Sequence, residues 1–284
     1  MINVRKIDSV EIMDTIKKMF LESAYNIGDD VYRSICEAKY REESIIAKEV
    51  LNQLIENYNI AKIEKIPICQ DTGYSVVFVE VGQEVLIING NLTSSIEEGV
   101  RKAYAEGFLR KSIVDDPLFI RENTKDNTPP VIHYDIIDGD KIKITAIAKG
   151  FGSENMSSIK MLSPSDGVEG LKSFVLETVK NAGPNPCPPI IVGIGIGGTM
   201  EKAAIMAKKA TVREINSHNK NKKYEELEKE LLFEINNLNI GPAGFGGKTT
   251  ALAVNIDYYP THIAGLPVAI NISCHATRHA YVVL

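Results

Sequence analysis

The chain has 284 residues, of which 44% are hydrophobic and 24% are charged, an ordinary globular composition. Its formal net charge of −5 provides no basic surface for a nucleic-acid backbone, so we expect no nucleic-acid binding. The first residues lack the basic start and apolar run of a secretory signal. The longest apolar stretch, residues 188–198, is far shorter than the ~20 residues that a membrane-spanning helix needs. We therefore expect a cytoplasmic protein that does not enter a membrane.

The first part of the chain, about residues 1–60, has the pattern of helices. Asp8 followed by Glu11 resembles a capping arrangement. Apolar side chains then recur at helical spacing, at Val10, Met13, Ile16, Met19 and Phe20. Two further helices are predicted at residues 30–39 and 42–58, and Cys36 lies inside the first of these two.

After residue 73 the pattern alternates between strands and helices. We predict strands at residues 75–81, 131–137, 141–148, 190–196, 251–257 and 268–272, and helices at residues 94–111, 168–181, 199–210 and 222–238. Asp138-Gly139 between two of these strands predicts a hairpin. The mixture indicates an α/β fold with a mixed sheet, flanking helices and a helical N-terminal region. No linker divides residues 1–284, so we expect a single domain.

Residues 193–198, Gly-Ile-Gly-Ile-Gly-Gly, follow a predicted strand and open a predicted helix. This is the setting of a dinucleotide-binding turn, and Glu214 stands at a suitable distance along the chain for a ribose contact. No clear parallel strand follows Glu214 closely, however, so the surrounding unit is incomplete. The alternative is a tight strand-to-helix turn that needs small residues. We expect no nicotinamide cofactor.

A second glycine-rich segment, residues 241–249, resembles a phosphate-binding loop. Its spacing fails because Pro242 occupies the place of the required first glycine, and a predicted helix precedes it where a strand is needed. Nucleotide hydrolysis is therefore excluded. The backbone N–H groups of such a turn are suited to binding a carboxylate.

Four cysteines lie far apart in a chain that has no export signal, at positions Cys36, Cys69, Cys187 and Cys274. In a reducing compartment metal binding, catalysis or burial is expected in preference to disulfides. All except Cys36 stand in segments that proline or polar residues keep out of regular structure. Packing explains a single buried cysteine most simply, but three in such segments together indicate a set of ligands.

Three thiolates suit an iron–sulfur cluster that leaves one iron without a protein ligand. Such an iron acts as a Lewis acid on a substrate hydroxyl and carboxylate. Because the chain contains no C-x-x-C pair, spacing alone does not identify the metal. A zinc site formed by the three cysteines and either His275 or His262 is the competing interpretation.

Six spaced motifs resemble, in the same order, the iron–sulfur part of class I fumarate hydratases and the related L-tartrate dehydratase α subunits. The resemblance extends from about residue 67 to residue 279. The motifs are Cys69-Gln70-Asp71-Thr72-Gly73, residues 148–155 (AKGFGSEN), residues 183–189 (GPNPCPP), residues 193–199 (GIGIGGT), residues 244–250 (GFGGKTT) and residues 262–274 (HIAGLPVAINISC).

The resemblance implies a 4Fe–4S cluster whose fourth iron binds a small dicarboxylate substrate. The residues that it implies are Cys69, Cys187 and Cys274 as cluster ligands, Gln70, Asp71 and Arg110 as substrate contacts, and Asp71 and His262 as catalytic residues. Arg101 and Lys111 are nearby alternatives to Arg110. In this interpretation Asp71 delivers or accepts the hydroxyl proton, and His262 orients it.

The expected activity is the reversible hydration of fumarate to malate by an α subunit. Dehydration of L-tartrate is the alternative, and a non-catalytic zinc-binding scaffold is the alternative from another class. The resemblance further implies a second domain with a catalytic base, which no part of this chain matches. We therefore expect a separate β subunit and a symmetric assembly of αβ units.

Overall fold

The computed structural model describes residues 4–284, and these residues form two compact units. Unit 1 consists of residues 4–27, 58–150 and 278–284, and unit 2 consists of residues 28–57 and 151–277. Each unit is therefore built from segments that are far apart in the sequence. A single functional domain over residues 1–284 stays a prediction.

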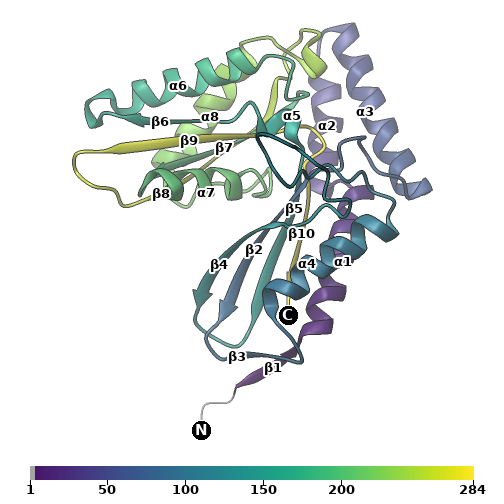
Figure 1. Cartoon of the computed structure of the whole chain (residues 1–284). Coiled ribbons are helices and arrows are strands. Elements are labelled where there is room, and N and C mark those ends of the chain that lie inside the picture. The colour runs from purple at the N-terminus through teal and green to yellow at the C-terminus, as the bar shows by residue number, and fades with distance from the viewer. Residues whose placement is uncertain (1–3) are drawn as a thin grey trace. The chain divides into compact units, whose positions relative to one another are not determined.

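The elements of the two units are shown in Figure 1. Unit 1 contains β1 (Arg5–Asp8), α1 (Ser9–Tyr25), β2 (Tyr74–Gly82), β3 (Val85–Ile88), α4 (Leu92–Glu106), β4 (Val131–Ile137), β5 (Ile142–Lys149) and β10 (Arg278–Val283). Unit 2 contains α2 (Asp29–Arg41), α5 (Phe151–Glu154), β6 (Ser158–Leu162), α6 (Gly167–Ala182), β7 (Ile190–Gly197), α7 (Met200–Ala210), α8 (Lys222–Asn236), β8 (Ala251–Tyr259) and β9 (Leu266–Ser273). Helix α3 (Ile45–Glu64) begins in unit 2 and ends in unit 1, and short 3₁₀ turns occur at Pro164–Asp166 and Pro242–Gly244.

The predicted helical N-terminal region is confirmed by α1, α2 and α3. Asp8 is the N-cap of α1, and its carboxylate accepts the backbone N–H of Val10 at 2.8 Å. Ile12, Ile16 and Phe20 on the inner face of this helix are almost fully buried. Helix α3 has 20 residues, yet no helix among residues 4–284 combines the length and apolarity that crossing a membrane requires.

The sheet of unit 1 has the strand order β10-β5-β2-β4. Strand β5 is antiparallel to both β10 and β2, whereas β4 runs parallel to β2. The predicted hairpin at Asp138-Gly139 is therefore wrong, because β2 lies between the two strands that this turn connects. The end of β2 occupies the space inside the turn, where the backbone N–H of Gly82 donates to the Lys141 carbonyl and that of Gln83 to the Ile137 carbonyl, both at 2.9 Å. The local turn signal was correct, but it does not specify which strand pairs with which.

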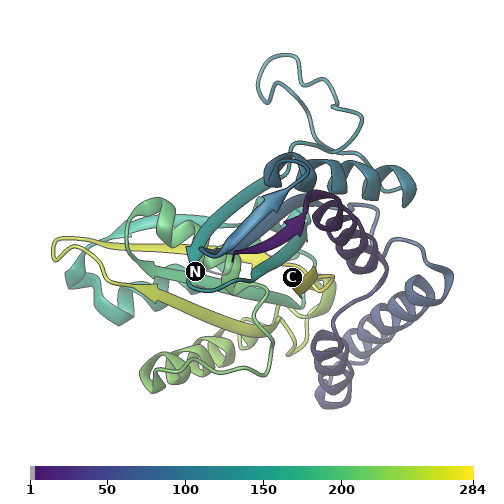
Figure 2. The same cartoon turned by 90° about the horizontal axis from the view of Figure 1, so that it is seen from below.

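Helices α1 and α4 cover one face of this sheet, and their apolar side chains form a continuous core with those of β2 and β5. Strands β1 and β3 form a separate parallel pair, visible side by side in Figure 2. The connection between α4 and β4, residues 107–130, extends away from the rest of unit 1 as the teal loop in the same view. These elements bring the segment before β2 next to the end of α4.

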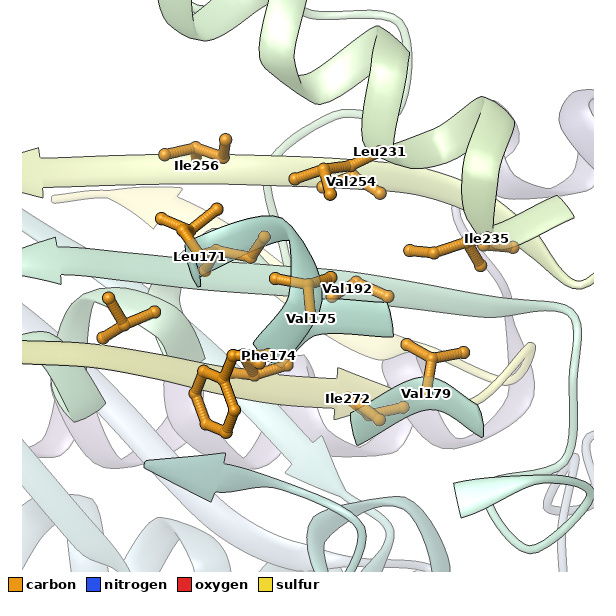
Figure 3. Close-up of a cluster of buried hydrophobic side chains, with 14 of the residues drawn as sticks. Leu171, Phe174, Val175, Val179, Val192, Leu231, Ile235, Val254, Ile256 and Ile272 are labelled. Carbon is orange, nitrogen blue, oxygen red and sulfur yellow. The ribbon is translucent and has the colours of Figure 1, made fainter. Parts of the chain in front are cut away.

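The sheet of unit 2 has the strand order β6-β9-β7-β8, with β7 parallel to β8 and antiparallel to β9. The mixed sheet with flanking helices that the sequence predicts is thereby confirmed. One face of the sheet packs against α6 and α8, where Val175, Leu231 and Val192 belong to one buried cluster (Figure 3).

The opposite face of the same sheet is covered by α7, with Ala203 and Ala207 packed on Ala269 of β9. Gly193 and Gly195 lie inside β7 and point to this face, because side chains alternate along a strand. A Cβ atom at Gly195 would stand 2.0 Å from the backbone oxygen of Ala203. Gly193 and Gly195 thus allow α7 to approach β7 closely.

Candidate functional site

Residues 69–73 form the segment between α3 and β2 in unit 1, and Cys69 at its start is exposed. The Thr72 hydroxyl donates a hydrogen bond of 2.8 Å to the backbone carbonyl of Arg110. The hydroxyl of the buried Tyr104 lies 2.9 Å from the carbonyl oxygen of Thr72 and 2.8 Å from that of the next residue. The backbone after Cys69 is therefore fixed, while the thiol faces outward.

Asp71 in this segment is held through both its side chain and its backbone. Its carboxylate accepts the backbone N–H of Gly73 at 2.9 Å, and its carbonyl accepts a hydrogen bond from the Arg278 guanidinium. Arg278 is only 2% exposed. A Cβ atom at Gly150 would stand 3.4 Å from both this guanidinium and an Asp71 carboxylate oxygen. The guanidinium and the carboxylate therefore lie close together beside Gly150. Gln70, just before Asp71, is exposed.

Sequence reasoning did not identify Tyr104 and Arg278 as parts of this site. Burial raises the pKa of the Tyr104 hydroxyl above its ordinary value, which keeps the group protonated and able to donate. Arg278 begins β10 and pairs with Ala148 of β5. The sequence feature that could have identified Arg278 is its position: a charged residue four positions after Cys274, at the start of an apolar strand.

Three cations were candidates for binding a substrate carboxylate. The guanidinium of Arg101 donates to Asp126 at 2.9 Å and also pairs with Glu98, so its donors are engaged. Arg110 is exposed, and its side chain has no ion pair within residues 4–284. Lys111 beside it is likewise exposed. Arg110 is therefore better placed than Arg101 to offer a guanidinium to an incoming carboxylate.

Unit 2 brings two of the three predicted cysteine ligands together. Cys187 precedes β7, and Cys274 follows β9. Because these strands are antiparallel and Ile191 stands opposite Ser273, the start of β7 and the end of β9 lie at the same edge of the sheet. The backbone N–H of His275 donates to the Cys187 carbonyl at 3.3 Å. Both cysteines thus belong to one small region of unit 2.

The end of β9 is braced by residues of the 148–155 motif and its continuation. The Asn271 amide donates to the Glu154 carboxylate at 3.0 Å and lies 3.1 Å from the Ser157 hydroxyl oxygen. The backbone N–H of Ile272 lies 3.2 Å from the same hydroxyl oxygen. These contacts fix the strand that leads into Cys274.

His262 lies at the other end of the same strand, in the connection between β8 and β9 (Figure 1). It is exposed, and its Nδ1 accepts the backbone N–H of Ala264 at 3.2 Å. The 8 residues of β9 separate it from Cys274, a distance of about 27 Å at about 3.4 Å per residue. His262 therefore cannot act on a group bound to Cys274 of the same chain, nor complete a zinc site there. Of the two histidines considered as zinc ligands, only His275 lies next to Cys274 in the sequence.

The three cysteines fit a sulfur-bound cofactor by their chemistry. All are thiols rather than disulfides, and each lies outside the helices and strands. Cys69 belongs to unit 1, whereas Cys187 and Cys274 belong to unit 2. Within residues 4–284 no group of three or more His, Cys, Asp or Glu side chains is gathered as a metal site. Soft sulfur donors are those that iron–sulfur clusters use.

Known proteins resemble this chain over almost its whole length. A protein named "Putative L(+)-tartrate dehydratase subunit alpha" from Methanocaldococcus jannaschii is 46% identical over 280 residues, which cover 95% of this chain and 96% of that protein. The L(+)-tartrate dehydratase subunit alpha of Escherichia coli strain UTI89 is 35% identical over 254 residues, covering 88% of this chain and 83% of that protein.

The model of one protein family, described as fumarate hydratase (Fumerase), matches residues 13–283. This range includes the cysteine segments of both units, the glycine-rich loop and the buried residues that hold Asp71. The resemblance seen in the sequence motifs is confirmed by this match and by the relatives. The chain belongs to the fumarate hydratase (Fumerase) family of hydro-lyases.

Proposed function

We propose that this chain is the α subunit of an iron–sulfur hydro-lyase that removes water from L(+)-tartrate. The observation that carries the proposal is the meeting of Cys187 and Cys274 at one edge of the unit 2 sheet. The names of the relatives favour tartrate over the fumarate that the motifs first suggested. Hydration of fumarate is the second candidate, because the family model carries that description.

Cys69, Cys187 and Cys274 would hold a 4Fe–4S cluster. When bound, such a cluster supplies an iron without a protein ligand, which acts as a Lewis acid on the substrate hydroxyl and carboxylate. The exposed positions of Cys69 and Cys187 leave their thiolates accessible to a cofactor.

The polar residues near Cys69 would bind the substrate and move its protons. Arg110 offers two parallel N–H groups to a carboxylate, and the Gln70 amide adds a neutral donor beside it. Asp71 would hold a proton at the substrate hydroxyl, since a departing hydroxide must be protonated. The Arg278 hydrogen bond to its backbone keeps Asp71 in place during this transfer.

A role for His262 requires a second copy of the chain, because β9 separates it from the cysteine edge of its own unit. Mixing a His262→Ala chain with a Cys187→Ser chain tests this arrangement under subunit exchange. A site shared between copies restores activity to about one quarter of wild type, since half of the pairs are mixed and each has one intact site. A mixture of Cys187→Ser and Cys274→Ser provides the control and stays inactive. If the His262→Ala mixture also stays inactive, His262 does not act across copies.

Tartrate and malate differ by one hydroxyl group, which makes the substrate question measurable. A site that hydrogen-bonds the extra hydroxyl rejects a substrate without it by a large factor, on the order of 10⁴. Assays with L-tartrate, D-tartrate, malate and fumarate therefore separate the two candidate functions. Greater turnover of malate than of L-tartrate would overturn the tartrate assignment.

Iron binding is tested with four single cysteine-to-serine variants reconstituted without oxygen. Variants of Cys69, Cys187 and Cys274 are expected to lose iron and sulfide, because serine cannot replace a cluster thiolate. Cys36→Ser is the matched control, since Cys36 lies within α2, and it should keep the wild-type iron content. Equal iron loss in all four variants, or zinc in place of iron, refutes the cluster assignment and favours the zinc-binding scaffold.

A separate β subunit is part of the proposal, because both relatives are named as subunit alpha. The reconstituted chain should bind iron alone but turn over substrate only after a β subunit is added. Full turnover by this chain alone contradicts the divided site. The mass of the active complex then tests the proposed symmetric assembly of αβ units.

A further inference from the structure

Glu42, between α2 and α3, is a buried carboxylate with an unusual number of donors around it. It is 2% exposed. Its Oε2 accepts the backbone N–H of Lys248 at 2.9 Å, and the backbone N–H and hydroxyl of Thr249, each at 3.0 Å. Its Oε1 accepts the backbone N–H of Glu43 at 3.0 Å and of Ser44 at 3.2 Å. One side chain thus connects two segments that are more than 200 residues apart in sequence.

The charge of Glu42 is retained in this position. Burial by itself raises the pKa of the carboxyl, but the donors of Lys248, Ser44, Glu43 and Thr249 outweigh burial and lower the pKa below its ordinary value. A carboxylate that accepts several backbone N–H bonds is stabilised in its ionised form. Glu42 is therefore an anion at neutral pH.

Two of the donor residues, Lys248 and Thr249, belong to the glycine-rich loop, residues 241–249, that resembles a phosphate-binding loop in the sequence. Gly247 has a φ of +109°, and a Cβ atom there would stand 3.1 Å from Glu42 and 2.8 Å from the Ala47 side chain. Only glycine leaves room for the carboxylate at this point. The anion that this loop binds is thus a side chain of the same unit.

The other side of the glycine-rich loop contacts the segment of residues 184–189 that carries Cys187. The backbone N–H of Ala243 donates to the Pro188 carbonyl at 2.8 Å. A Cβ atom at Gly244 would stand 2.4 Å from the Pro184 side chain, so Gly244 packs closely against Pro184. Cys187 itself has a φ of +55°, a left-handed conformation that a non-glycine residue keeps only when its surroundings impose it.

We propose that Glu42 is a positioning residue for Cys187, acting through the glycine-rich loop. Glu42 holds the end of the loop at Lys248 and Thr249, and the loop in turn holds Pro188 and the strained Cys187. Its importance for iron binding rests on the proposed function. The connection from Glu42 to Cys187 itself does not, because every contact in it lies within unit 2.

Among residues 4–284, no other charged side chain makes this connection. Lys248 Nζ pairs with Glu43 at 2.7 Å, but the two side chains are 61% and 74% exposed. Solvent screens such an exposed pair, so it holds the loop only weakly. Glu43 is therefore a matched control: it lies next to Glu42, carries the same charge and contacts the same lysine.

The test compares Glu42→Gln with Glu43→Gln in the chain without cofactor. Glutamine keeps the volume of Glu42 but turns an NH₂ group toward backbone donors. Hydrogen exchange at the amides of Lys248, Thr249 and Ala243 should rise at least about tenfold in Glu42→Gln and stay unchanged in Glu43→Gln. Because the Cys187 thiol is already exposed, its rate of alkylation by iodoacetamide reports its local conformation rather than access, and this rate should change in Glu42→Gln but not in Glu43→Gln, with Cys69 in unit 1 as the internal reference. Glu42→Asp, which keeps the charge, should recover part of the wild-type protection.

Each outcome decides the proposal. A loosened loop with unchanged Cys187 alkylation breaks the connection between them, and an unchanged loop removes the role of Glu42 altogether. If Glu42→Gln does not fold, Glu42→Asp carries the same comparison with a shorter side chain. Iron retention after reconstitution is measured last. If wild type binds no iron, the proposed function fails while the alkylation result still stands.

Discussion

Tyr104 offers the sharpest test of how the Cys69 segment is held. The side chain is fully buried, and its hydroxyl is the donor to the carbonyls of Thr72 and Gly73. Tyr104→Phe keeps the ring and removes only this donor. The Gly73 carbonyl retains a longer contact of 3.3 Å with the Asn127 amide, so mainly the Thr72 carbonyl loses its partner.

The expected cost follows from one buried carbonyl left without a good hydrogen bond, about 1 to 2 kcal/mol of unfolding free energy. Urea unfolding measures this cost as a lower midpoint at unchanged slope. Tyr281→Phe is the control, since Tyr281 lies in the same unit on β10 and is 62% exposed, and it should change stability by less than about 0.5 kcal/mol. Equal stability of the two variants would falsify the inferred bracing.

Two further predictions concern packing and pH. Gly195→Ala should destabilise unit 2 by about 3 kcal/mol, since its methyl group meets the α7 backbone, whereas Gly265→Ala meets nothing within 4 Å and should be neutral in thermal unfolding. For Asp126, burial raises the pKa, but hydrogen bonds from Thr128 and from the Arg101 guanidinium outweigh it and hold the pKa at about 2, against a usual 3.8. Its stabilisation is therefore complete above about pH 4 and is lost as the pH falls toward 2; after solvent screening it amounts to about 1 to 2 kcal/mol. Asp126→Asn should abolish this part of the acid dependence of urea unfolding, and an unchanged pH profile would contradict the assignment.

The elements with strong local patterns could be predicted from the sequence. Strand β4 was predicted with the bounds that the structure has, and β7 and α7 within one residue at each end. The short strands β1, β3, β6 and β10 were missed, because four to six residues give too little periodicity to distinguish a strand from a loop. Pairing was the harder question, since nothing local states that β2 lies between β4 and β5.

The candidate site shows the same limit at the level of single residues. Proline and polar neighbours mark the segments of the three cysteines locally, and the role of these cysteines as ligands stays a prediction. Tyr104, Arg278 and Glu42 could not be predicted, because each is hydrogen-bonded to backbone atoms far away in the sequence. The separation is 32 residues for Tyr104 and more than 200 for Arg278 and Glu42. Their side chains have ordinary neighbours in the sequence, and only the fold gives them a partner.

The backbone beside each of the three cysteines is held by a hydrogen bond from a residue far away in the sequence. Tyr104 donates to the backbone after Cys69, the Ala243 N–H donates to the backbone after Cys187, and the Ser157 hydroxyl oxygen lies 3.2 Å from the backbone N–H of Ile272 before Cys274. A ligand placed at the end of a strand has few backbone bonds of its own, so its position depends on such braces. Under the proposed function, loss of a brace should therefore reduce cofactor retention more than it reduces the stability of the unit. Cys69 belongs to unit 1 and Cys187 and Cys274 belong to unit 2, so each unit needs its own braces.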